Sequence, residues 1–204
     1  QCPPHPAAEF TPLPETLTMW ASICDKGILS HNAVRETAHV SLALPEVQSR
    51  REVVPLRDGR MLHDYANLYF HARNPMMYYL REQHGRLCVL RICDSVLDIP
   101  GTMIADRNAA RCQTWFHPSP DGLRYLNKHL VFARDWTHPN PERADYQKAV
   151  KCAEILVPHQ VSKHKIVGAY VRCDDAYYDM MALEAPWPVT QCPDIFFQAE
   201  SDVW

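Results

Sequence analysis

Three short apolar runs rich in β-branched residues constrain the fold of this chain more than any other feature. They occupy residues 87–92, 153–157 and 165–171. Each run is shorter than an average helix and lacks the period of an amphipathic helix, so each predicts a buried strand. Helical patterns are interspersed among these runs without a regular strand–helix alternation. The sequence therefore predicts an α+β fold with a sheet at its core.

Helical and turn signals divide the rest of the chain into short segments. Leu17, Trp20 and Ile23 follow helical spacing, and Gly27 stands where the end of that helix is expected. Further expected segments are helices at 144–150 and 177–183, a helix start at 106–110, strands at 103–104 and 194–198, a strand or short helix at 65–70, and mainly loop at 115–145. No internal repeat and no low-complexity tract interrupts this pattern.

The 204 residues are expected to form one domain. Residues 1–14 are rich in proline and are expected to be an extended or poorly ordered lead-in, which places the domain at residues 15–204. No apolar run approaches the ~20 residues of a membrane-spanning helix. The first thirty residues also show no signal-peptide pattern. We expect a cytoplasmic monomer with no membrane partner.

Cysteines are numerous, with eight spread singly along the chain. No pair has the C-x₂-C spacing of a zinc site, and disulfide frameworks are typical of much smaller chains. Cys88 and Cys152 lie in apolar surroundings, where cysteine behaves as a small hydrophobic residue. The pattern favours buried free thiols in a reducing compartment over disulfides, and it predicts no metal site.

Charge is separated along the chain, although the formal net charge is only −3. Residues 48–86 carry seven arginines against four acidic residues, whereas residues 174–204 carry seven acidic residues and no lysine or arginine. One interpretation is that these charged stretches are only solvent-exposed surfaces with no binding role. The tyrosines interleaved with the arginines favour a surface that stacks bases and contacts phosphates of single-stranded nucleic acid.

Glycine-based nucleotide motifs are absent from the sequence. It contains neither a P-loop nor a G-x-G-x-x-G nor a G-x-S-x-G pattern, and only six glycines in total. Any phosphate contact would therefore depend on arginine, whose guanidinium binds phosphate with two parallel hydrogen bonds.

Glu154 is the most informative single residue because it lies in an otherwise apolar strand pattern. A buried, unpaired carboxylate is costly there, so Glu154 either faces solvent from an edge strand or has a function. The functional interpretation is a general base or an anchor for a sugar hydroxyl. The sequence leaves both alternatives open.

Two polar segments offer further candidate side chains. His63 and Asp64 could form a catalytic pair, but neighbouring residues on a strand face opposite ways, which favours a structural role. Asn74 and Pro75 place a turn before a soft apolar patch that begins at Met76.

These segments occur in an order that resembles the DarT family of DNA ADP-ribosyltransferase toxins. The resemblance spans about residues 10–172 and is carried by Gly27-Ile28-Leu29-Ser30, Arg50-Arg51, Leu62-His63-Asp64-Tyr65, Tyr69-Phe70, Asn74-Pro75-Met76-Met77, Asp106-x-Asn108-Ala109 and Ala153-Glu154-Ile155-Leu156-Val157. Each piece is weak alone, and the order and spacing together make the match specific.

The resemblance implies an ADP-ribosyltransferase fold with a split, mixed sheet and flanking helices. It implies transfer of ADP-ribose from NAD⁺, as co-substrate, onto a thymine or guanine base of single-stranded DNA. The usual partner of the family is a macrodomain antitoxin that removes the modification. Arg51 and Glu154 match the family's catalytic positions.

The resemblance also assigns binding residues. It assigns NAD⁺ contacts to Gly27, Leu29, Arg50, Arg51 and Tyr69, and substrate contacts to His63, Tyr65, Arg73, Met76, Tyr78 and Asn108. One position departs from the family, which has a histidine just before the first helix: ungapped alignment places Thr16 there, and a gapped alignment places Glu9 there.

Other functions stay open at this stage. The acidic end of the chain would repel a polyanion in the same groove, which favours RNA or protein as an alternative target of the same reaction. The missing histidine is consistent with a catalytically impaired, nucleic-acid-binding descendant of the fold. The presence of Arg51 and Glu154 argues against that descendant.

Overall fold

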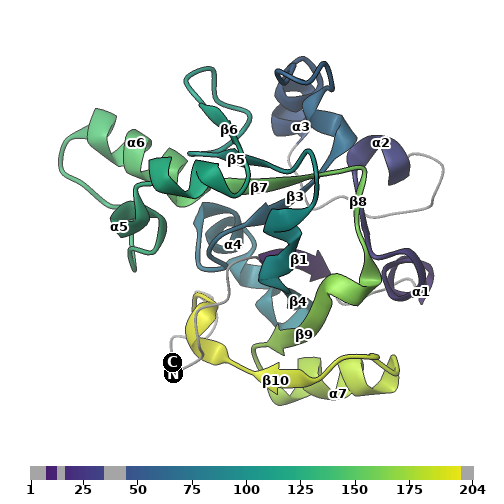
Figure 1. Cartoon of the computed structure of the whole chain (residues 1–204). Coiled ribbons are helices and arrows are strands. Elements are labelled where there is room, and N and C mark those ends of the chain that lie inside the picture. The colour runs from purple at the N-terminus through teal and green to yellow at the C-terminus, as the bar shows by residue number, and fades with distance from the viewer. Residues whose placement is uncertain (1–7, 13–16, 35–44, 199–204) are drawn as a thin grey trace.

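The computed structural model describes residues 8–12, 17–34 and 45–198, and its architecture is α+β, as predicted (Figure 1). The described strands are β1 (Ala8–Pro12), β2 (Ile28–Leu29), β3 (Tyr65–Tyr69), β4 (Leu87–Ile92), β5 (Met103–Ala105), β6 (Phe116–Pro118), β7 (Glu154–Pro158), β8 (Gln160–Val161), β9 (Ile166–Val171) and β10 (Val189–Gln191). The described α-helices are α1 (Leu17–Lys26), α2 (His31–Val34), α3 (Pro45–Glu52), α4 (Pro75–Tyr79), α5 (Lys128–Val131), α6 (Pro141–Lys151) and α7 (Asp174–Ala182). Short 3₁₀ helices occupy Leu62–Asp64, Arg81–Arg86, Asp94–Asp98, Asp121–Tyr125, Lys163–Lys165 and Pro193–Ile195.

The larger sheet is mixed and split. Its strand order is β10-β9-β4-β1-β3-β7-β5-β6, and β2 and β8 form a separate small sheet. Strands β9 and β10 are parallel, whereas the other neighbours are antiparallel. Strand β1 pairs with β4 along its whole length, but its register with β3 consists of the single pair Ala8 and Tyr69. The sheet therefore divides into two halves between β1 and β3, in agreement with the split sheet that the resemblance implies.

Strand β1 comes from the segment that was expected to precede the domain. The backbone of Ala8–Pro12 is extended, as predicted, but it lies inside the sheet, between β4 and β3. Both partners are more than fifty residues away in the sequence, so no local pattern could indicate this pairing. The remaining residues of the lead-in, 1–7 and 13–14, lie outside the described residues.

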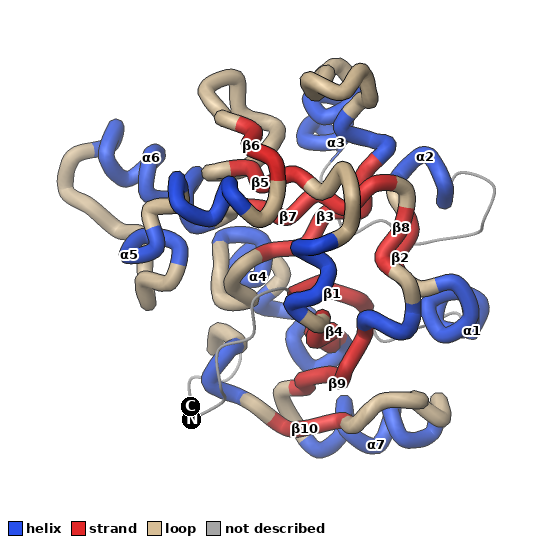
Figure 2. Tube along the Cα trace, viewed as in Figure 1, coloured by secondary structure: helices blue, strands red, loops and turns tan. Residues whose placement is uncertain are grey.

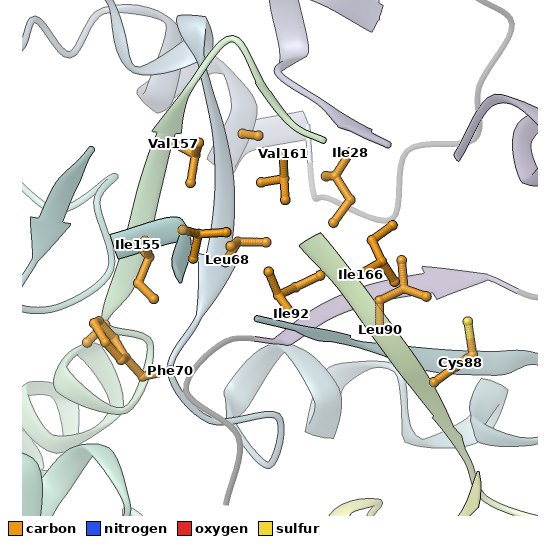
Figure 3. Packing of buried hydrophobic residues seen from close by; sticks show 14 of the residues in the cluster. Ile28, Leu68, Phe70, Cys88, Leu90, Ile92, Ile155, Val157, Val161 and Ile166 are labelled. Atoms are coloured by element: carbon orange, nitrogen blue, oxygen red, sulfur yellow. The ribbon is translucent and has the colours of Figure 1, made fainter. Parts of the chain in front are cut away.

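Alternation along the strands assigns the two faces of the sheet. On β3, Ala66 and Leu68 enter the large hydrophobic cluster, whereas Tyr65 and Tyr69 face the opposite side. The large cluster packs Ile155 and Val157 of β7 with Leu68 and with residues of β4 and β9 (Figure 3). Elements α1, α5, α6 and α7 contribute side chains to it. This cluster is the main core and leaves the other face for the site.

The opposite face carries two smaller clusters. Met77 of α4 packs against Leu87 and Val89 of β4 and against Phe196, near the end of the described chain. The second smaller cluster packs the 3₁₀ helix Leu62–Asp64 against β5 and β7. Figure 2 shows α4 and α3 near β3, at separate places along the sheet.

Most of the expected elements are confirmed. The three apolar runs form β4, β7 and β9, and residues 65–69 form a strand. Helix α6 begins at Pro141, earlier than predicted, because the side chain of Asn140 caps it by accepting from the Arg143 N–H at 3.0 Å. Helix α7 begins at Asp174, where two acidic residues favour a helix N-terminus.

Two expected elements are wrong. Residues 106–110 form turns rather than a helix start, because the Asn108 side chain accepts the Ala110 N–H at 2.9 Å and diverts the backbone. Residues 194–198 form no strand. The Ile195 N–H donates to the Cys192 carbonyl at 3.3 Å, which winds this segment into the 3₁₀ helix Pro193–Ile195.

The cysteine prediction is correct in part. The free cysteines of the described chain are Cys24, Cys88, Cys93, Cys112, Cys152 and Cys173, of which Cys88 and Cys152 are buried. Burial raises the pKa of Cys88 to about 12, so that thiol stays protonated. Cys112 is exposed, and Cys192 is disulfide-bonded, contrary to the expectation of buried free thiols throughout.

Candidate active site

Glu154 lies on an interior strand of the split sheet and is fully buried, with 0% of its surface exposed. It is the first residue of β7 and pairs with Tyr69 of β3 on one side and Ala105 of β5 on the other. Since β7 has a neighbour on each side, the alternative of a solvent-facing edge strand is wrong. A buried carboxylate at this position requires polar partners.

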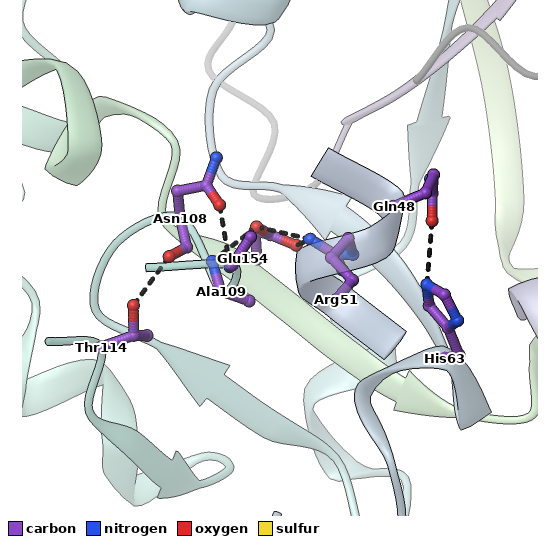
Figure 4. A network of polar contacts seen from close by, with 8 residues as sticks. Gln48, Arg51, His63, Asn108, Ala109, Thr114 and Glu154 are labelled. Carbon is purple, nitrogen blue, oxygen red and sulfur yellow. Dashed lines mark hydrogen bonds and ion pairs between the residues drawn. The ribbon is translucent and has the colours of Figure 1, made fainter. Parts of the chain in front are cut away.

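Arg51 supplies the main partner of Glu154. Its Nη1 atom lies 3.2 Å from Oε1 and 3.0 Å from Oε2 of the carboxylate, across 103 residues of sequence (Figure 4). The backbone N–H of Ala109 donates to Oε1 at 2.9 Å. Three hydrogen bonds from two separate segments therefore fix the orientation of the carboxylate.

The loop that follows β5 is shaped to aim the Ala109 N–H. The Asn108 N–H donates to the carbonyl of Ala149 at 2.9 Å, and the Thr114 hydroxyl donates to the Asn108 carbonyl at 2.7 Å (Figure 4). With the Asn108 side chain bound to the Ala110 N–H, the backbone around Ala109 is held on both sides. Asn108 thus acts in the site through the backbone it orders.

Helix α3 separates the two neighbouring arginines. Arg51 is buried, whereas Arg50 is exposed and its Nε donates to the Glu46 carbonyl one turn earlier at 3.1 Å. Consecutive helical residues point about 100° apart, so only one of the two can face the sheet. The structure brings Arg51 to Glu154 and turns Arg50 away.

Arg51 also retains hydrogen-bonding capacity. Within the described residues, its buried Nη2 atom has no hydrogen-bond partner. A buried donor without an acceptor is costly, and a bound ligand that supplies an oxygen removes that cost. An arginine N–H beside a carboxylate suits a ligand that carries phosphates and sugar hydroxyls, as NAD⁺ does. The residues present therefore fit the co-substrate that the resemblance implies.

Tyr69 borders the site on the side of the sheet split. It is paired with Glu154, and it is also the residue at which β3 meets β1. Directly paired residues point to the same face of a sheet, so the Tyr69 ring stands beside the Glu154 carboxylate. The ring is only partly buried and packs against Met77 and its neighbours.

His63 and Tyr65 lie at the other end of β3. The His63 Nε2 atom is 2.9 Å from Oε1 of Gln48 on α3 (Figure 4). The His63 ring also lies 4.1 Å from that of His31. The Tyr65 hydroxyl donates to Asp58 at 2.5 Å. Burial, followed by this hydrogen bond, raises the pKa of Tyr65 to about 12. Gln48 lies on α3, the helix that carries Arg51, and Asp58 lies in the loop that follows α3. His63 and Tyr65 therefore support this helix and this loop through hydrogen bonds.

Arg73, Met76 and Tyr78 follow β3 on the side of the smaller cluster that contains Met77. Asn74 caps α4 by accepting the N–H groups of Met76 and Met77 at 2.9 and 3.1 Å. Met76 is partly buried in the same cluster as Tyr69. Arg73 donates to the Phe196 carbonyl at 2.6 Å, and Tyr78 is exposed. These residues form a surface next to the site rather than its floor.

Gly27 joins α1 to β2, and Leu29 lies in the small sheet that β2 forms with β8. Gly27 has a φ of +84°, and an added Cβ would lie 2.1 Å from the Val161 carbonyl oxygen, so glycine is required there. The Ser30 N–H donates to the His159 carbonyl at 2.7 Å, just after β7. Thr16, the counterpart of the family histidine, lies outside the described residues.

A buried lysine near the site was missed by the sequence reasoning. Lys151 is 1% exposed, and its Nζ donates to the carbonyls of Val131 (2.9 Å) and Ala133 and lies 2.9 Å from Nδ1 of His71. Burial lowers the pKa of Lys151 to about 8. Burial and the Lys151 charge lower the pKa of His71 to about 4. A lysine at a helix end ordinarily faces water, so composition gave no signal for this contact.

The described residues contain neither a metal-binding cluster nor a membrane-spanning helix. No group of three or more histidine, cysteine, aspartate or glutamate side chains is placed to hold a metal ion. None of the described helices is long and apolar enough to cross a membrane.

Two solved structures of DarT proteins share the fold of this chain. A DarT of Thermus sp. 2.9 in complex with ADP-ribosylated ssDNA superposes with a TM-score of 0.80 at 22% identity, over 95% of this chain and 97% of that one. DarTG of Thermosipho africanus in complex with ADP-ribose superposes with a TM-score of 0.75 at 24% identity, over 94% of this chain and 51% of that one. The fold is that of an ADP-ribosyltransferase.

Sequence comparison then gives the family. The family described as "ssDNA thymidine ADP-ribosyltransferase, DarT" matches residues 18–190, and the chain belongs to this family. A Thermosipho africanus protein, a DNA ADP-ribosyl transferase–DNA ADP-ribosyl glycohydrolase fusion, is 30% identical over 155 residues. That match covers 74% of this chain and 39% of the relative, so the chain spans well under half of the fusion protein's length.

Proposed function

We propose that this protein transfers ADP-ribose from NAD⁺ to a thymine base of single-stranded DNA. The observation that carries the proposal is the buried Arg51–Glu154 pair, with Nη1 of Arg51 3.0 Å from Oε2, at the split of an ADP-ribosyltransferase sheet. Membership of a family described as an ssDNA thymidine ADP-ribosyltransferase supports the same reaction.

The pair suits the charge that develops when nicotinamide leaves the ribose. NAD⁺ supplies the ADP-ribosyl group and a good leaving group. The Glu154 carboxylate can accept a hydrogen bond from a ribose hydroxyl and stabilise the positive charge that develops on the sugar. It can also accept a proton from the attacking base nitrogen. Arg51 orients the carboxylate and offers its unpartnered Nη2 to an oxygen of the substrate. Both roles depend on fixed geometry, which burial provides.

The family description favours thymine over guanine as the target base. The resemblance in the sequence left thymine and guanine open, and the description of the matching family names thymidine. The relative in complex with ADP-ribosylated ssDNA supports DNA over RNA or protein as the acceptor. RNA and protein remain the alternative acceptors that the experiment below tests.

We also propose a partner and a compartment. The Thermosipho africanus relative joins a transferase to a DNA ADP-ribosyl glycohydrolase, which supports a separate or fused glycohydrolase, the macrodomain antitoxin of the resemblance, as partner. Six of the seven cysteines in the described part of the chain are free, which supports a reducing compartment, the cytoplasm, where DNA is available, whereas the disulfide at Cys192 argues against it. The monomeric state stays a prediction from sequence.

Mass spectrometry of defined acceptors tests the proposed function. The protein is incubated with NAD⁺ and, separately, with a thymine-containing oligonucleotide, the same oligonucleotide with each thymine replaced by guanine, a matched RNA and a mixture of proteins. The expected result is a gain of one ADP-ribose on the thymine oligonucleotide alone. A gain on RNA or protein only, or no gain and no NAD⁺ consumption, would overturn the proposal.

A further inference from the structure

Three aromatic side chains from distant parts of the sequence meet beside α4. The ring of Tyr78, on α4, lies 5.2 Å from that of Phe197 and 6.1 Å from that of Trp136, and the Trp136 and Phe197 rings are 5.7 Å apart. All three pairs meet edge to face, with interplanar angles of 80–87°. We call these three residues the aromatic triad.

Arginines flank the triad. The guanidinium of Arg73 lies 3.8 Å from the centre of the Phe197 ring, and that of Arg81 lies 4.5 Å from the centre of the Tyr78 ring. Arg134 adds a third positive charge close enough to Arg73 to lower its pKa, after the larger effect of burial. Rings combined with arginines suit a ligand that carries both flat bases and phosphates.

The triad is continuous with the candidate active site. Phe197 and Met76 belong to the same hydrophobic cluster as Tyr69, which is paired with Glu154 in the sheet. The backbone of Met76 hydrogen-bonds with the thiol of Cys152. Met76 therefore lies next to Cys152, the residue two positions before Glu154. A strand of DNA whose target base enters at Glu154 would therefore pass Tyr69 and Met76 before it reaches the triad.

Exposure distinguishes the triad from an ordinary buried aromatic cluster. A cluster that only fastened the end of the chain would be expected to bury its rings, yet 45% of the Tyr78 surface is exposed and Trp136 and Phe197 are only partly buried. The Arg73 Nε is also buried without a hydrogen-bond partner among the described residues, a cost that a stabilising contact alone does not explain.

We propose that Tyr78, Trp136 and Phe197, with Arg73 and Arg81, form a subsite that stacks an unpaired base of single-stranded DNA next to the modified nucleotide. The proposal rests on the proposed function for its choice of ligand. Every base has an aromatic face, so this subsite adds affinity for a single strand without reading its sequence. Duplex DNA hides these faces and would gain nothing from the triad.

Binding of a fluorescent oligonucleotide, measured by anisotropy without NAD⁺, tests the subsite. Tyr78→Leu removes the stacking ring and keeps an apolar side chain, and Tyr79→Leu is the matched control, since Tyr79 is the next residue on α4 and is 55% exposed. We expect Tyr78→Leu to weaken single-strand binding about tenfold. Tyr79→Leu should change it less than twofold, and neither substitution should alter duplex binding.

A salt series and a kinetic measurement complete the test. Arg81→Gln should flatten the dependence of single-strand affinity on salt, because one phosphate contact is lost. In ADP-ribose transfer, Tyr78→Leu should raise the KM for the oligonucleotide and leave the KM for NAD⁺ unchanged. Equal single-strand affinities for the Tyr78→Leu and Tyr79→Leu proteins, at matched thermal stability, would overturn the subsite.

The two proposals fail in different ways. If the wild-type protein binds the single strand through Tyr78 but adds no ADP-ribose to it, the proposed function is overturned and the subsite is supported. If it modifies thymine and Tyr78→Leu neither weakens binding nor raises the KM, the subsite is overturned and the function is supported.

Discussion

One guanidinium nitrogen of Arg51 bonds to both carboxylate oxygens of Glu154, at 3.2 and 3.0 Å, while another is left without a partner in the described part of the chain. The first contact stabilises a carboxylate that is fully buried. The second leaves a donor for a substrate oxygen. The same arginine thus connects the stability of the fold with the chemistry proposed for it.

Removing Arg51 is expected to destabilise the protein through Glu154. Arg51→Met leaves a buried carboxylate without its cation, and we expect a loss of about 3–5 kcal/mol in the free energy of unfolding. Urea unfolding measures this loss. The double variant Arg51→Met/Glu154→Gln should recover a large part of it, because the uncompensated charge is gone.

Arg50→Met is the control for that experiment. Arg50 is exposed on the same helix, so its removal should change the free energy of unfolding by less than about 0.5 kcal/mol. If Arg51→Met and Arg50→Met were equally stable, the pair would have no role in holding Glu154.

The close approach of Gly27 to the backbone of Val161 predicts a sharp difference between two glycines. Both Gly27 and Gly59 have positive φ, +84° and +86°, but only at Gly27 would a Cβ meet backbone atoms, and at Gly59 nothing lies within 4 Å. Gly27→Ala should cost about 3 kcal/mol or more, since strain and a backbone clash combine. Gly59→Ala should cost about 1 kcal/mol, the strain alone. Thermal and urea unfolding compare them, and equal costs would refute the close approach at Gly27.

The contact between His71 and Lys151 predicts a loss of stability in acid. The pKa of His71 is lowered to about 4, so between that value and about 6.5 the unfolded chain binds more protons than the folded one. Stability is therefore full above pH 6.5 and falls as the pH drops towards 4, by about 3 kcal/mol for this group.

Unfolding of His71→Gln at pH 7, 5.5 and 4.5 checks this effect. Glutamine keeps an acceptor for the Lys151 ammonium but does not titrate, so this variant should lose less stability in acid than the wild type. Identical pH dependence in the two proteins would show that His71 is not held neutral by its surroundings.

Local patterns predicted three core strands, one of which carries Glu154. The runs that became β4, β7 and β9 are apolar and β-branched, and Glu154 was conspicuous because it interrupts one of them. The role of Arg51 came from the resemblance. Composition could not separate it from Arg50, since the choice depends on which face of α3 meets the sheet.

Long-range contacts account for what sequence could not predict. The pairing of β1, the Ala109 N–H and the burial of Lys151 all depend on segments that are distant in the chain. A backbone N–H is present at nearly every residue, so no sequence signal marks the one that points at Glu154. The turn at residues 106–110 was mistaken for a helix start because its polar residues suit both.

The proposed role of the Glu154 carboxylate in ADP-ribose transfer is tested by replacing the carboxylate with an amide. An alanine at Glu154 would leave Arg51 buried and unpaired, whereas Glu154→Gln keeps the shape and an acceptor for the Arg51 and Ala109 donors. The most direct measurement is the rate of ADP-ribose transfer from NAD⁺ to a thymine oligonucleotide by the wild type and Glu154→Gln, with unfolding curves for both. The account predicts a fall of at least about 100-fold with the fold retained. A folded Glu154→Gln protein that transfers ADP-ribose within tenfold of the wild-type rate would contradict it.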